Sequence, residues 1–100
     1  GSEKIWPAQM VLLALGFLGP EKSLAEKFKL KLDERGNIKT DNLFQSSKNK
    51  IFAAGDARRG QSLIVWAISE GRDSAFEVDK FLMGKTVLTK KNRKGDLISA

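Results

Sequence analysis

The apolar residues between Gln61 and Leu82 recur in steps of four, three, four, three and four, and this spacing constrains the fold more than any other feature. The residues that share the spacing are Ile64, Ile68, Gly71, Ala75, Val78 and Leu82. Because this period places side chains on one face of an α-helix, we predict a helix over residues 61–82 with its apolar face packed on the rest of the chain. Glycine costs a helix about 1 kcal/mol, so Gly71 predicts another backbone close by. Gly84 is expected to end the helix.

Two apolar runs that precede this helix predict strands. Residues 10–15 form a continuous apolar run, which suits a strand buried on both faces of a parallel sheet. A short buried helix is the alternative for this run. Residues 51–54 predict a second short strand that stops at Gly55 and Asp56, and residues 57–60 then form a loop before the long helix.

A hairpin is predicted between the two runs. Residues 28–32 alternate apolar and charged side chains, as a half-buried strand does. Residues 33–37 are predicted to form the turn of the hairpin, because Gly36 stands at a position where a turn favours a left-handed backbone conformation. Residues 38–40 then return as the partner strand.

With the remaining segments, the chain is expected to be a mixed α/β fragment, in which short strands and one hairpin pack on one long helix. Residues 21–27 predict a short helical turn, and residues 41–50 are polar and irregular, with Leu43 and Phe44 available as anchors. Sheet edges left exposed in such a fragment favour self-association or domain swapping.

The length and the residue types limit what the chain does by itself. One hundred residues form one small domain or part of a larger one. The chain starts with Gly1 and Ser2 and no initiator Met, which is typical of a protease-cleavage scar, so we expect a piece cut from a longer protein. Without Cys or His, this segment holds no disulfide, no thiolate or imidazole metal site and no Cys or His catalytic group. Its apolar runs are too short to span a membrane.

The net charge of +6 is placed unevenly. Residues 85–100 carry most of it, from Lys85, Lys90, Lys91, Arg93 and Lys94 against Asp96. We predict that most of this tail is disordered, with Val87 and Leu88 resting on the body. A basic module that binds nucleic acid or an acidic protein is the alternative class of function. Charge gathered in a tail, without basic and aromatic residues interleaved on any element, argues against it.

The segment from residue 51 to the helix start has an order of elements that suits cofactor binding: a strand, a short loop and the start of a helix. Ligands of α/β sheets bind beyond the carboxyl ends of strands, and Gly55 and Asp56 follow a predicted strand. Gly55 lets a ligand approach the backbone because it has no Cβ, and Asp56 can accept hydrogen bonds from ligand hydroxyls. The helix start near Gln61 directs free N–H groups and a partial positive charge at an electron-rich or anionic ring edge.

Each of these features also has a purely structural interpretation. The glycine–aspartate pair is then a plain turn, and Arg58 and Arg59 are solvated loop charges. Gln61 and Ser62 then serve only the helix N-terminus, and Trp66 is an ordinary core side chain. No single feature decides between the two interpretations.

The continuous sequence over residues 53–68 is far more specific for one family than any of its residues taken singly. Residues 53–68, AAGDARRGQSLIVWAI, closely resemble the C-terminal signature of the glutamate synthase small (beta) subunit family. Residues 11–20 resemble the strand and crossover that leave the family's nucleotide-binding domain, and residues 32–39 resemble the hairpin that follows. The resemblance extends over residues 5–84.

The resemblance implies an FAD-dependent NAD(P)H oxidoreductase with two dinucleotide-binding domains. Hydride passes from NADPH or NADH to the flavin, and electrons continue through iron–sulfur clusters elsewhere in the complex. The family makes glutamate from 2-oxoglutarate and glutamine-derived ammonia. On this basis residues 1–2 are the scar, residues 3–20 end the nucleotide-binding domain, residues 21–84 belong to the FAD-binding domain and residues 85–100 form the basic tail.

The resemblance also assigns cofactor-binding residues. Gly55 and Asp56 match the motif whose Asp bonds the ribityl and pyrophosphate side of FAD, and Gly16 matches the crossover near the domain boundary. The residues that match the helix start facing the flavin pyrimidine edge are Gln61, Ser62 and Leu63. There the helix dipole would stabilise negative charge on a reduced flavin. We expect no catalytic residue and no metal ligand on this segment, and we expect it to be inactive alone because it lacks the glycine fingerprints for FAD and NADP.

Related flavin enzymes share much of the signature. The alternatives within the class are a ferredoxin–NADP oxidoreductase, a sulfide oxidoreductase and the matching part of dihydropyrimidine dehydrogenase, and the run over residues 58–62 favours glutamate synthase. The implied partners are the rest of the FAD and NAD(P) domains and the glutamate synthase large subunit, in the cytoplasm or an organelle. The choice between NADPH and NADH stays open, because the family's residues that make it lie upstream of this segment.

Overall fold

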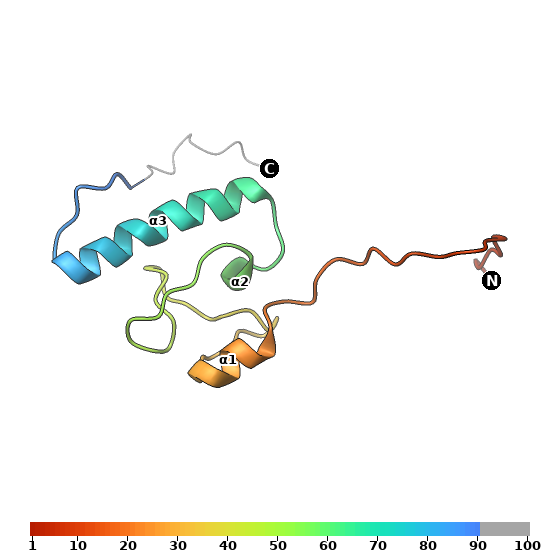
Figure 1. Cartoon of the computed structure of the whole chain (residues 1–100), viewed down its shortest axis with the longest axis horizontal. Helices are drawn as coiled ribbons and strands as arrows, with labels where there is room; N and C mark the ends of the chain where they lie inside the picture. The colour runs from red at the N-terminus through yellow and green to blue at the C-terminus, as the bar shows by residue number, and fades with distance from the viewer. Residues whose placement is uncertain (91–100) are drawn as a thin grey trace.

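A computed structural model describes residues 1–90 of the chain (Figure 1). Its helices are α1 (Lys22–Phe28), α2 (Asp56–Arg59) and α3 (Ile64–Met83). Figure 1 shows α3 along one side of the body and α1 on the opposite side, with loops between them. The N-terminal segment runs away from this body as an extended arm. None of the helices in this part of the chain is both long enough and apolar enough to cross a membrane.

The long helix predicted over residues 61–82 is confirmed as α3, which begins three residues later. Leu63, the N-cap, has extended backbone and makes no side-chain capping hydrogen bond. At the other end Gly84 takes a left-handed conformation with φ 76°, and its N–H donates to the Lys80 carbonyl at 2.8 Å. The predicted stop at Gly84 is therefore confirmed, and its reason is the left-handed cap that glycine adopts without strain.

The predicted inward face of α3 is wrong. The side chains of α3 that are buried are Ser69, Glu70, Asp73, Ser74 and Glu77. By contrast, Ile68 is 58% exposed and Leu82 is 69% exposed. A Cβ built at Gly71 would meet no atom within 4 Å, so the backbone expected close to it is absent from the described residues. The helix turns its polar side inward because Glu70 on that side pairs with Arg58 and Arg59.

The strand predicted over residues 10–15 is also wrong for the described chain. This run is extended and exposed, with Leu12 84% accessible. A strand needs a neighbouring backbone to accept and donate its hydrogen bonds, and no segment of residues 1–90 lies beside this one. The strand predicted over residues 51–54 is reduced to one isolated antiparallel bridge, between Phe52 and Gln45. Two backbone hydrogen bonds hold it, from the Ser46 N–H to the Ile51 carbonyl at 2.9 Å and from the Ala53 N–H to the Phe44 carbonyl at 3.0 Å.

The hairpin is confirmed only at its turn. The helical turn expected over residues 21–27 is α1, but α1 includes Phe28, so the strand predicted over residues 28–32 is wrong. One antiparallel bridge between Leu32 and Ile38 remains of the paired strands, and residues 1–90 contain no regular β-strand. Gly36 has φ 82°, as predicted for the turn.

The turn at residues 33–37 is built by an aspartate, and the next turn repeats it. The Asp33 Oδ1 atom accepts from the N–H groups of Arg35 and Asn37, at 2.9 and 3.0 Å. In the second turn, Asp41 Oδ1 accepts from the N–H groups two and four residues on, at 2.8 and 3.0 Å. Phe44 occupies the place that Gly36 holds in the first turn, with φ 63°.

The core contact of this region comes from Phe44. Its side chain is 1% exposed, so the predicted anchor is confirmed, whereas Leu43 is exposed and is no anchor. The other buried apolar side chains of the described residues are Ala25 and Ile38. The core is therefore small, and polar contacts hold much of the body.

Two further expectations need correction. The loop predicted over residues 57–60 is mostly the short helix α2. After α3, Val87 is exposed and does not rest on the body. Lys90 instead returns to α3, where its Nζ pairs with Glu77 and lies 5.4 Å from the centre of the Phe76 ring. The predicted disorder from residue 91 onward lies outside the described residues.

Candidate functional site

Gly55 joins the segment before it to α2 in a conformation that other residues rarely adopt, with φ 66° and ψ −145°. The residue is buried, and a Cβ built on it would lie 3.5 Å from the Cα and Cβ atoms of Ala67 in α3. Gly55 thus permits close approach to its backbone, and the neighbour within the described chain is α3, whereas the sequence predicts that a ligand makes this approach. This contact places the following residue, Asp56, at the start of α2 with its side chain exposed.

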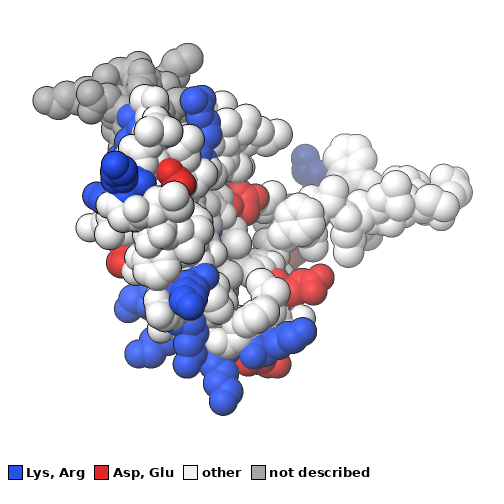
Figure 2. All heavy atoms as spheres, turned by 60° about the vertical axis from the view of Figure 1, so that its left-hand side comes forward, with Lys and Arg blue, Asp and Glu red and all other residues white. Residues whose placement is uncertain are grey.

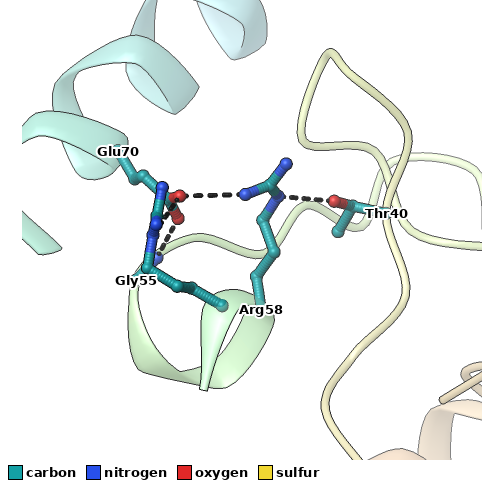
Figure 3. A network of polar contacts seen from close by, with 5 residues as sticks. Thr40, Gly55, Arg58 and Glu70 are labelled. Carbon is teal, nitrogen blue, oxygen red and sulfur yellow. Dashed lines mark hydrogen bonds and ion pairs between the residues drawn. The ribbon is translucent and has the colours of Figure 1, made fainter. Parts of the chain in front are cut away.

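A buried carboxylate on α3 holds this junction (Figure 3). Glu70 is 2% exposed, and its Oε2 atom accepts from the Gly55 N–H at 2.8 Å. Its Oε1 atom accepts from Arg58 Nη1 and Arg59 Nε, each at 2.9 Å. A buried carboxylate is tolerated when it is paired and hydrogen-bonded in this way. One side chain therefore fastens the N-cap and the C-terminal end of α2 to α3.

The two arginines are not solvated loop charges. Arg58 Nε donates to Thr40 Oγ1 at 2.7 Å, and its guanidinium carbon lies 4.9 Å from the centre of the Phe44 ring. The guanidinium carbon of Arg59 lies 4.1 Å from the Trp66 ring centre. Planar guanidinium groups suit such combined pairing and stacking. Trp66 is accordingly half-buried under an arginine and is not a core side chain.

Sequence reasoning missed Glu70 for an identifiable reason. Its spacing puts it off the apolar stripe of α3, and charged residues off a stripe are ordinarily assigned to solvent. The only local signal was the pair Arg58 and Arg59 upstream, whose contact with Glu70 depends on the chain folding back between α2 and α3.

A cavity of about 640 Å³ opens beside α2. Its lining residues are Phe17, Leu18, Gly19, Pro20, Arg35, Asn37, Asp56, Ala57, Gly60 and Gln61. They come from the end of the N-terminal arm, the turn at residues 33–37, and α2 with the residues that follow it. Among the described residues, no group of three or more acidic side chains gathers to hold a metal ion.

The predicted site residues divide between this cavity and its surroundings. Asp56 and Gln61 line the cavity, and Gly16 lies beside it. Gln61 Oε1 accepts from the Phe17 N–H at 3.4 Å, and a Cβ built at Gly16 would lie only 2.9 Å from that same oxygen. The structure thus brings residues 16–17 together with Gln61, which precedes α3 and is far from them in the sequence.

The other predicted residues lie outside the cavity lining. Gly55 is behind Asp56, against α3. Ser62 and Leu63 are exposed on the segment that leads into α3. Because the N-cap residue Leu63 offers no side-chain acceptor, the first N–H groups of α3 stay available to a ligand or solvent.

Positive and negative side chains are mixed on the surface. In Figure 2 many of the basic groups in view gather toward the bottom, on the side where Figure 1 places α1, and acidic groups lie among them. The face drawn is not uniformly basic, as a nucleic-acid surface would be.

Comparison with known proteins supports the resemblance read from residues 53–68. The pattern of the pyridine nucleotide-disulphide oxidoreductase family matches residues 1–71. The chain is 51% identical over 88 residues to the glutamate synthase [NADPH] small chain of Bacillus subtilis (strain 168), a match that covers 88% of this chain and 18% of that protein. It is 50% identical over 88 residues to the glutamate synthase [NADH] of Schizosaccharomyces pombe, covering 87% of this chain and 4% of that protein.

A third relative is the glutamate synthase [NADPH] small chain of Escherichia coli (strain K12), 46% identical over 79 residues, with 75% of this chain and 17% of that protein covered. The chain is homologous to these oxidoreductases over most of its own length. It spans only 17–18% of the length of the two bacterial small chains.

Proposed function

The chain belongs to the pyridine nucleotide-disulphide oxidoreductase family, and we propose that it is the FAD-facing C-terminal segment of a glutamate synthase small-chain type of oxidoreductase. The observation that carries the proposal is the 51% identity over 88 residues to a glutamate synthase small chain. The reaction of the whole protein would be transfer of hydride from NADPH or NADH to flavin, for glutamate synthesis. Relatives named for each nicotinamide match this segment, so it does not decide between the two.

The cavity beside α2 suits part of a flavin nucleotide. Gly19 and Gly60 add no side chain to the cavity wall. Asp56 also lines the cavity and is exposed to solvent. In this proposal Asp56 accepts hydrogen bonds from the ribityl hydroxyls, as a carboxylate does readily. The hydrogen bond from the Gly55 N–H to Glu70 keeps the backbone that carries Asp56 in one position.

The N-terminus of α3 would stabilise negative charge on the flavin ring. The chemistry supplied by FAD at this site would be acceptance of hydride, with negative charge on the reduced ring. Gln61, Ser62 and Leu63 lead into the uncapped N-terminus of α3, where the helix dipole provides partial positive charge. Such a preorganised dipole stabilises negative charge at the pyrimidine edge without reorganisation.

The exposed apolar surfaces support the proposal that other parts of the protein complete the site. The arm over residues 10–18 exposes its apolar side chains, and so does the stripe of α3 that contains Ile68 and Leu82. Exposed apolar patches of this extent mark interaction surfaces. We propose that they pack on the remainder of the FAD and NAD(P) domains, with residues 3–20 ending the nucleotide-binding domain and residues 21–84 in the FAD domain. The large chain would receive the electrons.

The test is FAD titration into this chain followed by flavin fluorescence. Asp56→Asn should weaken saturable binding, because the asparagine oxygen can still accept a hydrogen bond but no longer carries the charge. Glu34→Gln, the matched control, removes one exposed carboxylate outside the cavity and should leave binding intact. Equal binding by wild type and Asp56→Asn would contradict the assigned role of Asp56. A wild-type chain that does not bind FAD would contradict a working half-site on this segment.

A further inference from the structure

Asn37 lines the cavity with a side-chain amide that has no hydrogen-bond partner among residues 1–90. It is 3% exposed. Its backbone is fully engaged, since its N–H donates to Asp33 Oδ1 at 3.0 Å and its carbonyl accepts from the Asp33 N–H at 2.8 Å. Its side-chain amide makes no hydrogen bond to any atom of residues 1–90. Because buried amides are almost always hydrogen-bonded, a partner that enters the cavity, either water or a ligand, would complete this one.

The amide lies where a ligand in the cavity can reach it. A Cβ built at Gly60 would lie 3.2 Å from Asn37 Nδ2, and one built at Gly19 would lie 3.8 Å from Asn37 Oδ1. Both glycines line the cavity. Any larger residue at Gly60 would crowd the amide nitrogen, so glycine there leaves it open.

A cationic donor converges on the same place. The Arg35 Nη2 atom lies 3.2 Å from the same built Cβ at Gly60, so the guanidinium and the Asn37 amide face one point on the cavity wall. Arg35 forms no ion pair within residues 1–90, unlike Arg58 and Arg59. Two converging N–H donors, one of them charged, are the arrangement that binds an anionic oxygen.

We propose that Arg35 and Asn37 form a phosphate subsite of the cavity whose other side is Asp56. Donors for an anion at one wall and a carboxylate for hydroxyls at another fit a phosphorylated polyol. The ribityl phosphate of a flavin nucleotide is the member of this class that the proposed function names, and the inference rests on that function. Asn37 binds through its side chain, while its backbone alone holds the turn.

The experiment compares flavin mononucleotide with riboflavin, which lacks the phosphate, in titrations of the ¹⁵N-labelled chain followed by NMR. Flavin mononucleotide should shift the Asn37 side-chain amide and Arg35 Nε signals, and riboflavin should not. Inorganic phosphate alone should shift the same signals at higher concentration. Loss of one charge-assisted hydrogen bond should weaken binding of flavin mononucleotide about tenfold in Arg35→Gln and at least as much in Asn37→Asp, which adds a repelling charge.

Matched controls lie on the same chain. Asn42→Asp adds the same charge to an exposed asparagine in the second turn, and Arg72→Gln removes an exposed arginine of α3. Both should keep wild-type affinity. Circular dichroism should show unchanged helix content in all four variants, and Arg35→Gln, an exposed position, tests the proposal even if Asn37→Asp perturbs folding.

The outcomes separate this inference from the proposed function. Shifts at Asp56 and Gln61 with unchanged affinity in Arg35→Gln and Asn37→Asp would overturn the phosphate subsite and leave the flavin site standing. Equal affinity for riboflavin and flavin mononucleotide would overturn it as well. A wild-type chain in which millimolar flavin mononucleotide shifts no cavity signal would contradict both.

Discussion

The backbone N–H of Gly55 donates to the Glu70 carboxylate at 2.8 Å, across fifteen residues of sequence. This contact joins the junction that carries Asp56 to the long helix α3. The same carboxylate also holds Arg58 and Arg59, so the geometry of the cavity wall and the orientation of α3 depend on one buried charge.

Glu70→Gln should lower the free energy of unfolding by about 1–3 kcal/mol, because it removes charge-assisted bonds to two arginines. The cost stays in this range because both guanidinium groups are partly exposed and can be solvated. The glutamine oxygen can still accept from the Gly55 N–H, so the variant isolates the arginine pairs. Urea unfolding provides the measurement, with Glu34→Gln as an exposed control. Equal unfolding midpoints for Glu70→Gln and its control would show that the ion pairs of Glu70 with Arg58 and Arg59 do not stabilise the chain.

Phe44→Ala should destabilise the chain by about 3–5 kcal/mol, because it empties the place of a buried aromatic ring. It also removes the surface on which the Arg58 guanidinium stacks. Chemical denaturation measures the loss. A cost below 1 kcal/mol would mean that this ring is not part of the core.

Ile68→Ser should change the free energy of unfolding by less than about 0.5 kcal/mol, the usual effect of a surface substitution. Ile68 lies on the apolar stripe that the sequence predicts to be buried, yet its side chain is 58% exposed. The same denaturation experiment decides the matter. A loss of several kcal/mol would show that the stripe faces the core after all.

Lys29→Gly should stabilise the chain by about 0.5–1 kcal/mol. Lys29 caps α1 with φ 52° and ψ 45°, a left-handed conformation that strains a residue with a Cβ. The relief exceeds the entropy that glycine adds to the unfolded chain. Thermal unfolding monitored by circular dichroism measures it. Lys31→Gly, where φ is not positive, is the control and should lower stability.

Arg59→Ala should expose Trp66 to water, because the Arg59 guanidinium carbon lies 4.1 Å from the ring centre. In a Trp6→Phe background Trp66 is the one remaining tryptophan, so its emission reports the change directly. We expect a shift to longer wavelength and stronger quenching by acrylamide. Arg72→Ala, an exposed arginine elsewhere on α3, should leave both unchanged. Identical spectra for the two variants would rule out the stacked pair.

Local features were predictable where neighbouring residues suffice to form them. The spacing of apolar residues and Gly84 predict α3 and its end, because helix hydrogen bonds close within four residues. Gly36 predicts its turn because the conformation of one residue sets the turn. The string over residues 53–68 was enough to identify the family, since it is long and specific.

Tertiary structure alone decided which side of α3 faces inward, whether extended runs become strands, and what lines the cavity. Glu70 overrides the apolar stripe because two arginines from α2 reach its carboxylate, and periodicity within a helix carries no information about such partners. Residues 10–15 have strand composition but pair with no other segment of residues 1–90, and strand hydrogen bonds require a second backbone. Asn37 was read as part of a turn, and only the fold, by bringing Gly19 and Gly60 to either side of it, shows its amide facing a cavity.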